Sequence, residues 1–259
     1  MNDTRDIPDQ TPDGTAAHTD RTADEPPQAP RPPQAPHPAD PPQASHPADP
    51  PQAPHPSDAP QTPHPADPPP PISALLDAAA GAALPVLRAV RDDQMGWPTP
   101  CSEYDVRALL NHLFQVVVAF QTLAAKKDVD FSRTPDRLGE YGARWPDRFA
   151  DETVRLVEAW AAPGAEEGLT GGMQLPARTV GAMVLLDLTV HAWDLARATG
   201  RPYAPAAGCV TELRALAARM APTARTMNVF AAPVPVPPGA SDLDVLLAET
   251  GRDPHWTAG

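Results

Sequence analysis

The segment LLDLTVHAWDLARATG, residues 185–200, carries two carboxylates and one histidine in an otherwise apolar run. At 100° per residue of an α-helix, Asp187, His191 and Asp194 fall within about 60° of one another and form a single polar strip. A helix that is apolar around most of its circumference is usually buried. A buried carboxylate costs several kcal/mol unless something compensates its charge. The sequence therefore predicts a partner for Asp187.

A divalent metal ion is one candidate for this partner. Asp187 and His191 are four residues apart, a spacing that lets two side chains bind one cation from successive helical turns. A second helix would have to supply another ligand, and after residue 71 the remaining histidines are His112 and His255. A metal held by His112, Asp187 and His191 would keep an open position, as catalytic zinc sites do. A hydrogen-bonded Asp–His pair without metal explains the spacing equally well.

Other polar residues could complete such a site. Asp194 could itself be a ligand, but we expect it to orient a histidine ring or to pair with Arg197. Arg107 and Arg178 could receive a substrate carboxylate, although surface positions are the simpler expectation for both. Cys101 precedes a helix, where a thiolate would be stabilised, yet a loop residue packed on the bundle is the favoured interpretation.

The elements that must position these residues are predicted to be helices, because apolar residues recur with a helical period after Pro71. We expect Ser73 to cap the first helix, Pro85 to kink it, and Ser102 to form a capping box with Asp105. Helices are predicted over residues 73–90, 103–125, 146–161, 176–200, 206–219 and 242–250. With no strand pattern between them, the expected fold is all-α: an antiparallel four-helix bundle followed by an extra helix and an extended segment.

Residues 1–71 have a different composition. They hold 23 of the 38 prolines, eleven acidic residues against three arginines, and no aromatic residue other than histidine. Such a segment cannot bury enough apolar surface to offset its ordering entropy, so we predict a disordered tail over 1–71 and a folded domain over 72–259. Within the tail, a nine-residue repeat over 32–67 carries one histidine per unit and is typical of a semi-rigid spacer.

Composition also limits the partners. The net charge of −13 argues against nucleic acid and anionic membranes. The first ten residues are polar and acidic, and the two cysteines do not form a disulfide framework, so a cytoplasmic location is expected. Neither the oligomeric state nor a partner for the tail follows from the sequence.

Three motifs carry a resemblance to a known family: TPCSEYDVRALLNHL, LLDLTVHAWDLARATG and GRDPHW. Together they resemble the metal-binding family related to mycothiol-dependent maleylpyruvate isomerase, which belongs to the DinB-like four-helix superfamily. The resemblance covers roughly residues 73–256. It implies that His112, Asp187 and His191 bind zinc, although Asp187 is shorter than the glutamate of the isomerase. The separate C-terminal domain of the isomerase is replaced here by about sixty residues of different pattern.

The resemblance implies zinc-dependent thiol chemistry. A low-molecular-weight thiol, mycothiol, would be activated at the metal and would attack a small electrophilic substrate, giving transfer or isomerisation. Two alternatives remain open. The domain could be a non-catalytic metal-binding module whose tail docks a partner, or a metal-activated water could carry out hydrolysis.

Overall fold

A computed structural model describes residues 68–172 and 174–258. The predicted disordered tail and its histidine repeat fall almost entirely on residues 1–67, outside the described part of the chain, and stay predictions. The described residues confirm the mostly helical fold. Their helices are α1 (Ile72–Arg88), α2 (Val106–Ala124), α3 (Arg137–Tyr141), α4 (Trp145–Ala161), α5 (Ala177–Thr199), α6 (Ala207–Thr226) and α7 (Asp242–Glu249). Two short 3₁₀ turns, Asp92–Gln94 and Gly142–Arg144, lie between them.

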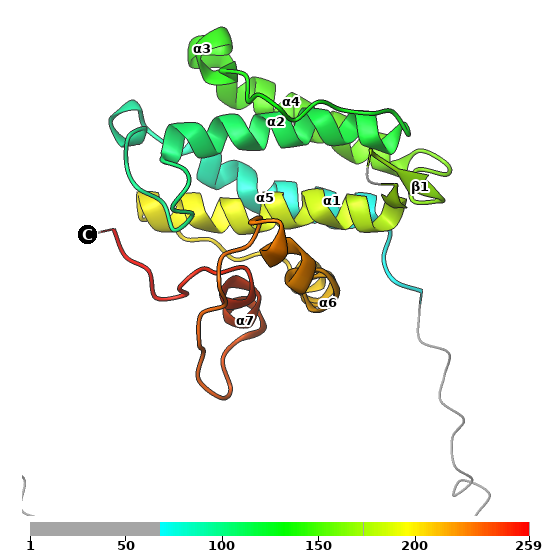
Figure 1. Cartoon of the computed structure of the whole chain (residues 1–259). Coiled ribbons are helices and arrows are strands. Elements are labelled where there is room, and N and C mark those ends of the chain that lie inside the picture. The colour runs from blue at the N-terminus through cyan, green and yellow to red at the C-terminus, as the bar shows by residue number, and fades with distance from the viewer. Residues whose placement is uncertain (1–67, 173, 259) are drawn as a thin grey trace, which may run out of the picture. The chain divides into compact units, whose positions relative to one another are not determined.

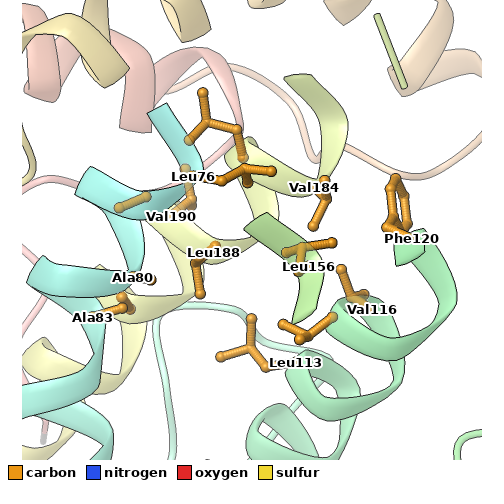
Figure 2. Close-up of a cluster of buried hydrophobic side chains, with 14 of the residues drawn as sticks. Leu76, Ala80, Ala83, Leu113, Val116, Phe120, Leu156, Val184, Leu188 and Val190 are labelled. Carbon is orange, nitrogen blue, oxygen red and sulfur yellow. The ribbon is translucent and has the colours of Figure 1, made fainter. Parts of the chain in front are cut away.

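Four of these helices surround the main hydrophobic core. Both α1 and α2 pack against α4 and α5, while α6 packs on α5 and α7 on α6 (Figure 1). Helix α5 is buried at 17 of its 23 positions because it contacts α1, α2 and α6. Its unusually apolar circumference follows from this central place. In Figure 2, Leu113, Leu156 and Leu188 converge on one another from three different helices.

A small hairpin, absent from the sequence prediction, connects α4 to α5. Strands β1 (Leu169–Thr170) and β2 (Leu175–Pro176) pair in antiparallel register. The hydroxyl of Thr170 donates to the carbonyl of Leu123 and so ties the hairpin to the end of α2. Strands of two residues are too short to show an alternating pattern, which is why the sequence predicted only a loop here.

Several predicted helix ends are corrected by the structure. Helix α2 begins at Val106, because the carboxylate of Asp105 caps it by accepting from the backbone N–H of Ala108. The predicted Ser102–Asp105 capping box is therefore wrong. Likewise, Pro71 rather than Ser73 is the N-cap of α1.

Helix α6 also extends beyond its predicted end at residue 219. It continues through Pro222 to Thr226, since tertiary contacts on both sides of the proline favour the helix. Ala221 is fully buried, and the guanidinium of Arg225 lies 2.9 Å from the Glu249 carboxylate. The C-terminus of α5 agrees with the prediction, with Gly200 in the left-handed conformation at φ 67°.

Helices α2 and α5 are long and apolar enough, by length and composition, to cross a membrane. Most of each apolar stretch is buried inside the bundle, 61% for α2 and 78% for α5. Packing in the core is therefore sufficient to explain their hydropathy. The cytoplasmic location stays a prediction.

Candidate metal centre

Three side chains that the sequence analysis considered as metal ligands converge between two core helices. Helix α2 supplies His112, and α5 supplies Asp187 and His191. One ligand atom from each lies within 4.8 Å of the others. Oδ1 of Asp187 is 3.8 Å from Nε2 of His112 and 3.6 Å from Nε2 of His191. Asp187 thus faces two imidazole nitrogens, as the polar strip on α5 led us to expect.

The spacing of these atoms suits a metal ion. Nitrogen and oxygen ligands about 2.1 Å from a tetrahedral zinc are roughly 3.4 Å from one another. A direct hydrogen bond between Asp187 and either histidine would need about 3.2 Å or less. The observed separations exceed that limit but are close to the ligand spacing. Two imidazoles and one carboxylate also form a donor set that zinc accepts.

The ring of His191 is fixed from its other side. Its Nδ1 lies 2.8 Å from Oδ2 of Asp194, a carboxylate with no exposed surface. A proton on Nδ1 shared with this carboxylate leaves the lone pair of Nε2 directed toward Asp187 and His112. This contact is the one expected of an Asp194 that orients the His191 ring, and that role stays a prediction. The expected pairing of Asp194 with Arg197 is wrong, because Arg197 lies over the Trp193 ring and donates to the carbonyl of Pro254.

The actual cationic partner of Asp194 is Arg252, from the segment that follows α7. Its Nη2 lies 3.2 Å from Oδ2 of Asp194, its Nη1 donates to the carbonyl of Thr250, and only 9% of the residue is exposed. Arg252 lies in the GRDPHW motif, but no spacing rule connects it with a residue 58 positions earlier. The motif GRDPHW could therefore be recognised in the sequence, but no role could be assigned to Arg252.

Tyr104 supports the second histidine. Its ring stacks on that of His112, with centroids 5.0 Å apart and planes 20° apart, and meets the His191 ring edge-on at 6.4 Å. Burial, together with the nearby Cys101, Asp187 and Glu103, raises the pKa of the Tyr104 hydroxyl. Tyr104 therefore stays protonated at neutral pH.

Cys101 lies closer to the site than its place in the sequence suggested. Its Sγ and one ligand atom each of His191 and Asp194 lie within 4.8 Å of one another. Burial raises the pKa of the Cys101 thiol, so the neutral form is favoured. The loop prediction is confirmed, but the fold places this loop against the histidine pair, which the sequence could not show. Cys209 is buried in the core.

A cavity of about 290 Å³ adjoins these residues. His112, Asp187 and His191 line it from the bundle, Tyr104 from the loop before α2, and Arg252 from the C-terminal segment. The three potential ligands therefore border a space that a small molecule can enter. An open coordination position beside such a space is what a catalytic metal requires.

Residues 76–196 match the family model described as the mycothiol maleylpyruvate isomerase N-terminal domain. This part of the chain is similar to that family. The matched segment includes α2, α4 and α5 as far as Ala196, and with them His112, Asp187 and His191. It ends before α6, so Arg252 and the GRDPHW motif lie outside it.

Two curated relatives also match. They are the uncharacterized proteins MT0763 and Rv0738, from two strains of Mycobacterium tuberculosis, and each is 33% identical over 132 residues. The alignment covers 48% of this chain and 64% of each relative, so the chain spans less than two thirds of their length. No solved structure matches the chain.

The two arginines suggested as substrate receivers are engaged elsewhere. Arg107 donates to both carboxylate oxygens of Asp136, and Arg178 pairs with Glu166 and Glu212. Neither arginine lines the cavity next to the histidines. The expectation that they receive a substrate carboxylate is not supported.

Asn111, adjacent to His112, has a role that the sequence did not reveal. Its side-chain amide donates to Asp136, and its carbonyl oxygen accepts from the backbone N–H of Leu138. These two bonds hold the start of α3 against α2. Asn111 therefore stabilises the stretch of α2 that carries His112.

Proposed function

We propose that His112, Asp187 and His191 hold a divalent metal, zinc, and that the domain catalyses thiol chemistry at this site. In the proposed reaction, a low-molecular-weight thiol attacks a small electrophilic substrate, giving group transfer or isomerisation. The convergence of three donor atoms within 4.8 Å at the edge of a cavity carries the proposal. The mycothiol-related family supports mycothiol as the thiol.

The contacts of Asp187 support a metal over a simple Asp–His pair, although its side chain is 29% exposed and not buried as the sequence predicted. Within the described residues, its salt-bridge contacts are to His112 and His191 alone, at 3.8 and 3.6 Å. Neutral imidazoles at such distances compensate a carboxylate poorly, because the atoms are too far apart for a strong hydrogen bond. A divalent cation between the three side chains would compensate it.

The surrounding residues have distinct roles in this proposal. Asp194 and Arg252 keep the His191 ring in one orientation, and Tyr104 keeps the His112 ring in place by stacking. Tyr104 also contributes a protonated hydroxyl group to the residues that line the cavity. When bound, the metal supplies a Lewis-acid position that favours the deprotonated, nucleophilic form of a thiol.

Zinc content tests the ligand assignment. His112→Ala, Asp187→Asn and His191→Ala should each hold about one zinc ion fewer than wild-type protein, because each removes one of three protein ligands. His255→Ala is the matched control, since His255 is exposed and outside the cavity. Equal zinc content in His112→Ala and wild type would contradict the assignment.

A thiol-dependent assay tests the activity. Zinc-loaded protein should consume a model electrophile faster with mycothiol than without it, and metal-free protein should show no such acceleration. Turnover without any thiol would favour hydrolysis by a metal-activated water. Bound zinc without turnover of any thiol and electrophile pair would favour the non-catalytic metal-binding module.

A further inference from the structure

A second cleft adjoins the candidate metal cavity, between α5, α6 and the segment that follows α6. Its volume is about 190 Å³. It is lined by Leu175, Met183, Leu186, Asp187, Leu216, Ala217, Met220, Thr223, Ala224, Met227, Val229 and Phe230. Among these described residues, Asp187 is the sole charged side chain, and it lies at the end shared with the metal cavity. The rest of the cleft is almost entirely apolar.

The cleft and the metal cavity are adjacent. Leu186, Asp187, Val229 and Phe230 line both of them. A molecule that reacts beside Asp187 would therefore have the cleft directly next to it. Helix α6 packs against α5 at an angle (Figure 1).

The composition of the cleft defines what it would accept. Met183, Met220 and Met227 contribute flexible, polarisable thioethers, which adapt to apolar groups of varied shape. An apolar cavity of about 150 Å³ is large enough for benzene, so the present volume admits a phenyl ring or a short alkyl chain. It is too small for a peptide helix, which favours part of a small molecule as the occupant.

We propose that this cleft binds an apolar substituent, aliphatic or aromatic, of the electrophilic substrate. The inference rests on the proposed function, because the cleft can hold part of a substrate only if the reaction takes place beside Asp187. The substrate class is then a hydrophobic electrophile, whose reactive carbon lies near the metal ligands and whose apolar group lies between α5 and α6. Met183, Met220 and Ala224 are the residues that determine its specificity.

Methionine methyl resonances provide a direct test that does not depend on turnover. Full-length, zinc-loaded protein labelled with ¹³C at the methionine methyls is titrated with 1-butanol, 1-hexanol and 1-octanol. The signals of Met183, Met220 and Met227 should shift, while Met95, outside the cleft, should not. Affinity should rise about fourfold per methylene, the factor that corresponds to about 0.8 kcal/mol of apolar burial.

A matched pair of variants locates the binding. Ala224→Phe fills the cleft from a partly exposed position on α6 and should abolish the response to the alcohols. Ala218→Phe adds the same ring on an exposed position of the same helix that does not line the cleft, and should bind like wild type. If Ala224→Phe fails to fold, Met220→Gln, with nearly unchanged volume, should weaken 1-octanol binding at least tenfold.

The outcomes separate this inference from the proposed function. Alcohol binding with the expected chain-length dependence supports an apolar binding cleft. If the zinc and thiol assays fail while the alcohols bind, the metal site and the thiol chemistry are wrong, and the cleft binds an apolar group unrelated to that reaction. Equal shifts at Met95, or affinity independent of chain length, would overturn the inference. Self-association that Ala224→Phe abolishes would also overturn it, because the occupant would then be a second copy of the chain.

Discussion

The guanidinium of Arg252 lies 3.2 Å from the carboxylate of Asp194, although 58 residues separate them in the chain. The same carboxylate oxygen accepts from His191. The C-terminal segment therefore contributes to the orientation of a potential metal ligand on α5. Because the family match ends at residue 196, this contact joins the matched domain to a part of the chain beyond it.

We expect Arg252→Met to destabilise the fold strongly. The change leaves Asp194 buried without its cation, and breaking a buried ion pair in this way costs about 3–5 kcal/mol. Zinc affinity should also fall about 10- to 100-fold, since the contact that orients His191 is disturbed. Urea unfolding of the metal-free protein and a zinc titration measure the two effects separately.

Two further variants make this prediction specific. Adding Asp194→Asn to Arg252→Met removes the unpaired charge and should recover part of the lost stability. Arg214→Met breaks an ion pair with Asp242 that is largely exposed, and should change stability by about 1 kcal/mol or less. If Arg252→Met lowers the free energy of unfolding no more than Arg214→Met does, the buried pair does not stabilise the fold more than the exposed pair.

We expect Gly181→Ala to loosen the packing of α5 in the core. A Cβ at this position would lie 2.9 Å from Cγ2 of Ile72 and 2.9 Å from the Trp160 ring. Both neighbours are buried, so the added methyl group should destabilise by about 1–3 kcal/mol. Gly81→Ala is the control: α1 is exposed there, with no atom within 4 Å of the new Cβ, and alanine should stabilise by about 0.5–1 kcal/mol. Thermal melts of both variants would show opposite shifts.

Much of this arrangement could be predicted from the sequence because the information is local. The core helices have 17 to 23 residues with clear apolar periodicity, and α5 is apolar on nearly every side, which required a central place. The polar strip of Asp187, His191 and Asp194 also follows from helical spacing alone. A fold built from such helices brings α2 against α5, and with it His112 toward Asp187.

What could not be predicted depends on contacts between distant segments. Arg252 reaches Asp194 only after α6 and α7 have folded back on α5. Cys101 and Tyr104 approach the histidines because the loop before α2 packs beside them, and no spacing rule relates loop residues to a helix far along the chain. Helix α6 passes Pro222 because buried contacts outweigh the local preference of proline to end a helix.

Acid should weaken the attachment of α3 to α2. Bonds from the backbone of Gly139, the amide of Asn111 and the guanidinium of Arg107 lower the pKa of Asp136 below its ordinary 3.8. Since the folded pKa is the lower one, the stabilisation is present above 3.8 and is lost as pH falls through the folded value. Asp136→Asn should therefore be less stable than wild type at neutral pH, and the difference should shrink in acid. Urea midpoints measured across this range give the comparison; a difference independent of pH would contradict the role of the carboxylate charge.

Deleting residues 1–67 should leave the melting temperature of the helical domain unchanged. The tail is predicted to contribute no core residues, and the deletion leaves four residues ahead of α1, which begins at Ile72. Differential scanning calorimetry of the full and shortened chains tests this, and a loss of several degrees would show that the tail packs on the bundle. The shortened chain also lacks the four repeat histidines, His37, His46, His55 and His64, which could bind zinc independently.

Zinc should stabilise this shortened chain through the residues of the bundle. A ligand that binds only the folded state adds RT ln(1 + [L]/Kd), about 2.7 kcal/mol at a hundred times Kd. His112→Ala should abolish that gain, because it removes the ligand that α2 contributes, whereas His255→Ala should retain it. Chelation of wild-type protein should lower the melting temperature to that of the metal-free form. Equal stabilisation of His112→Ala and wild type would place the zinc elsewhere, and with it the site proposed for thiol chemistry would be wrong.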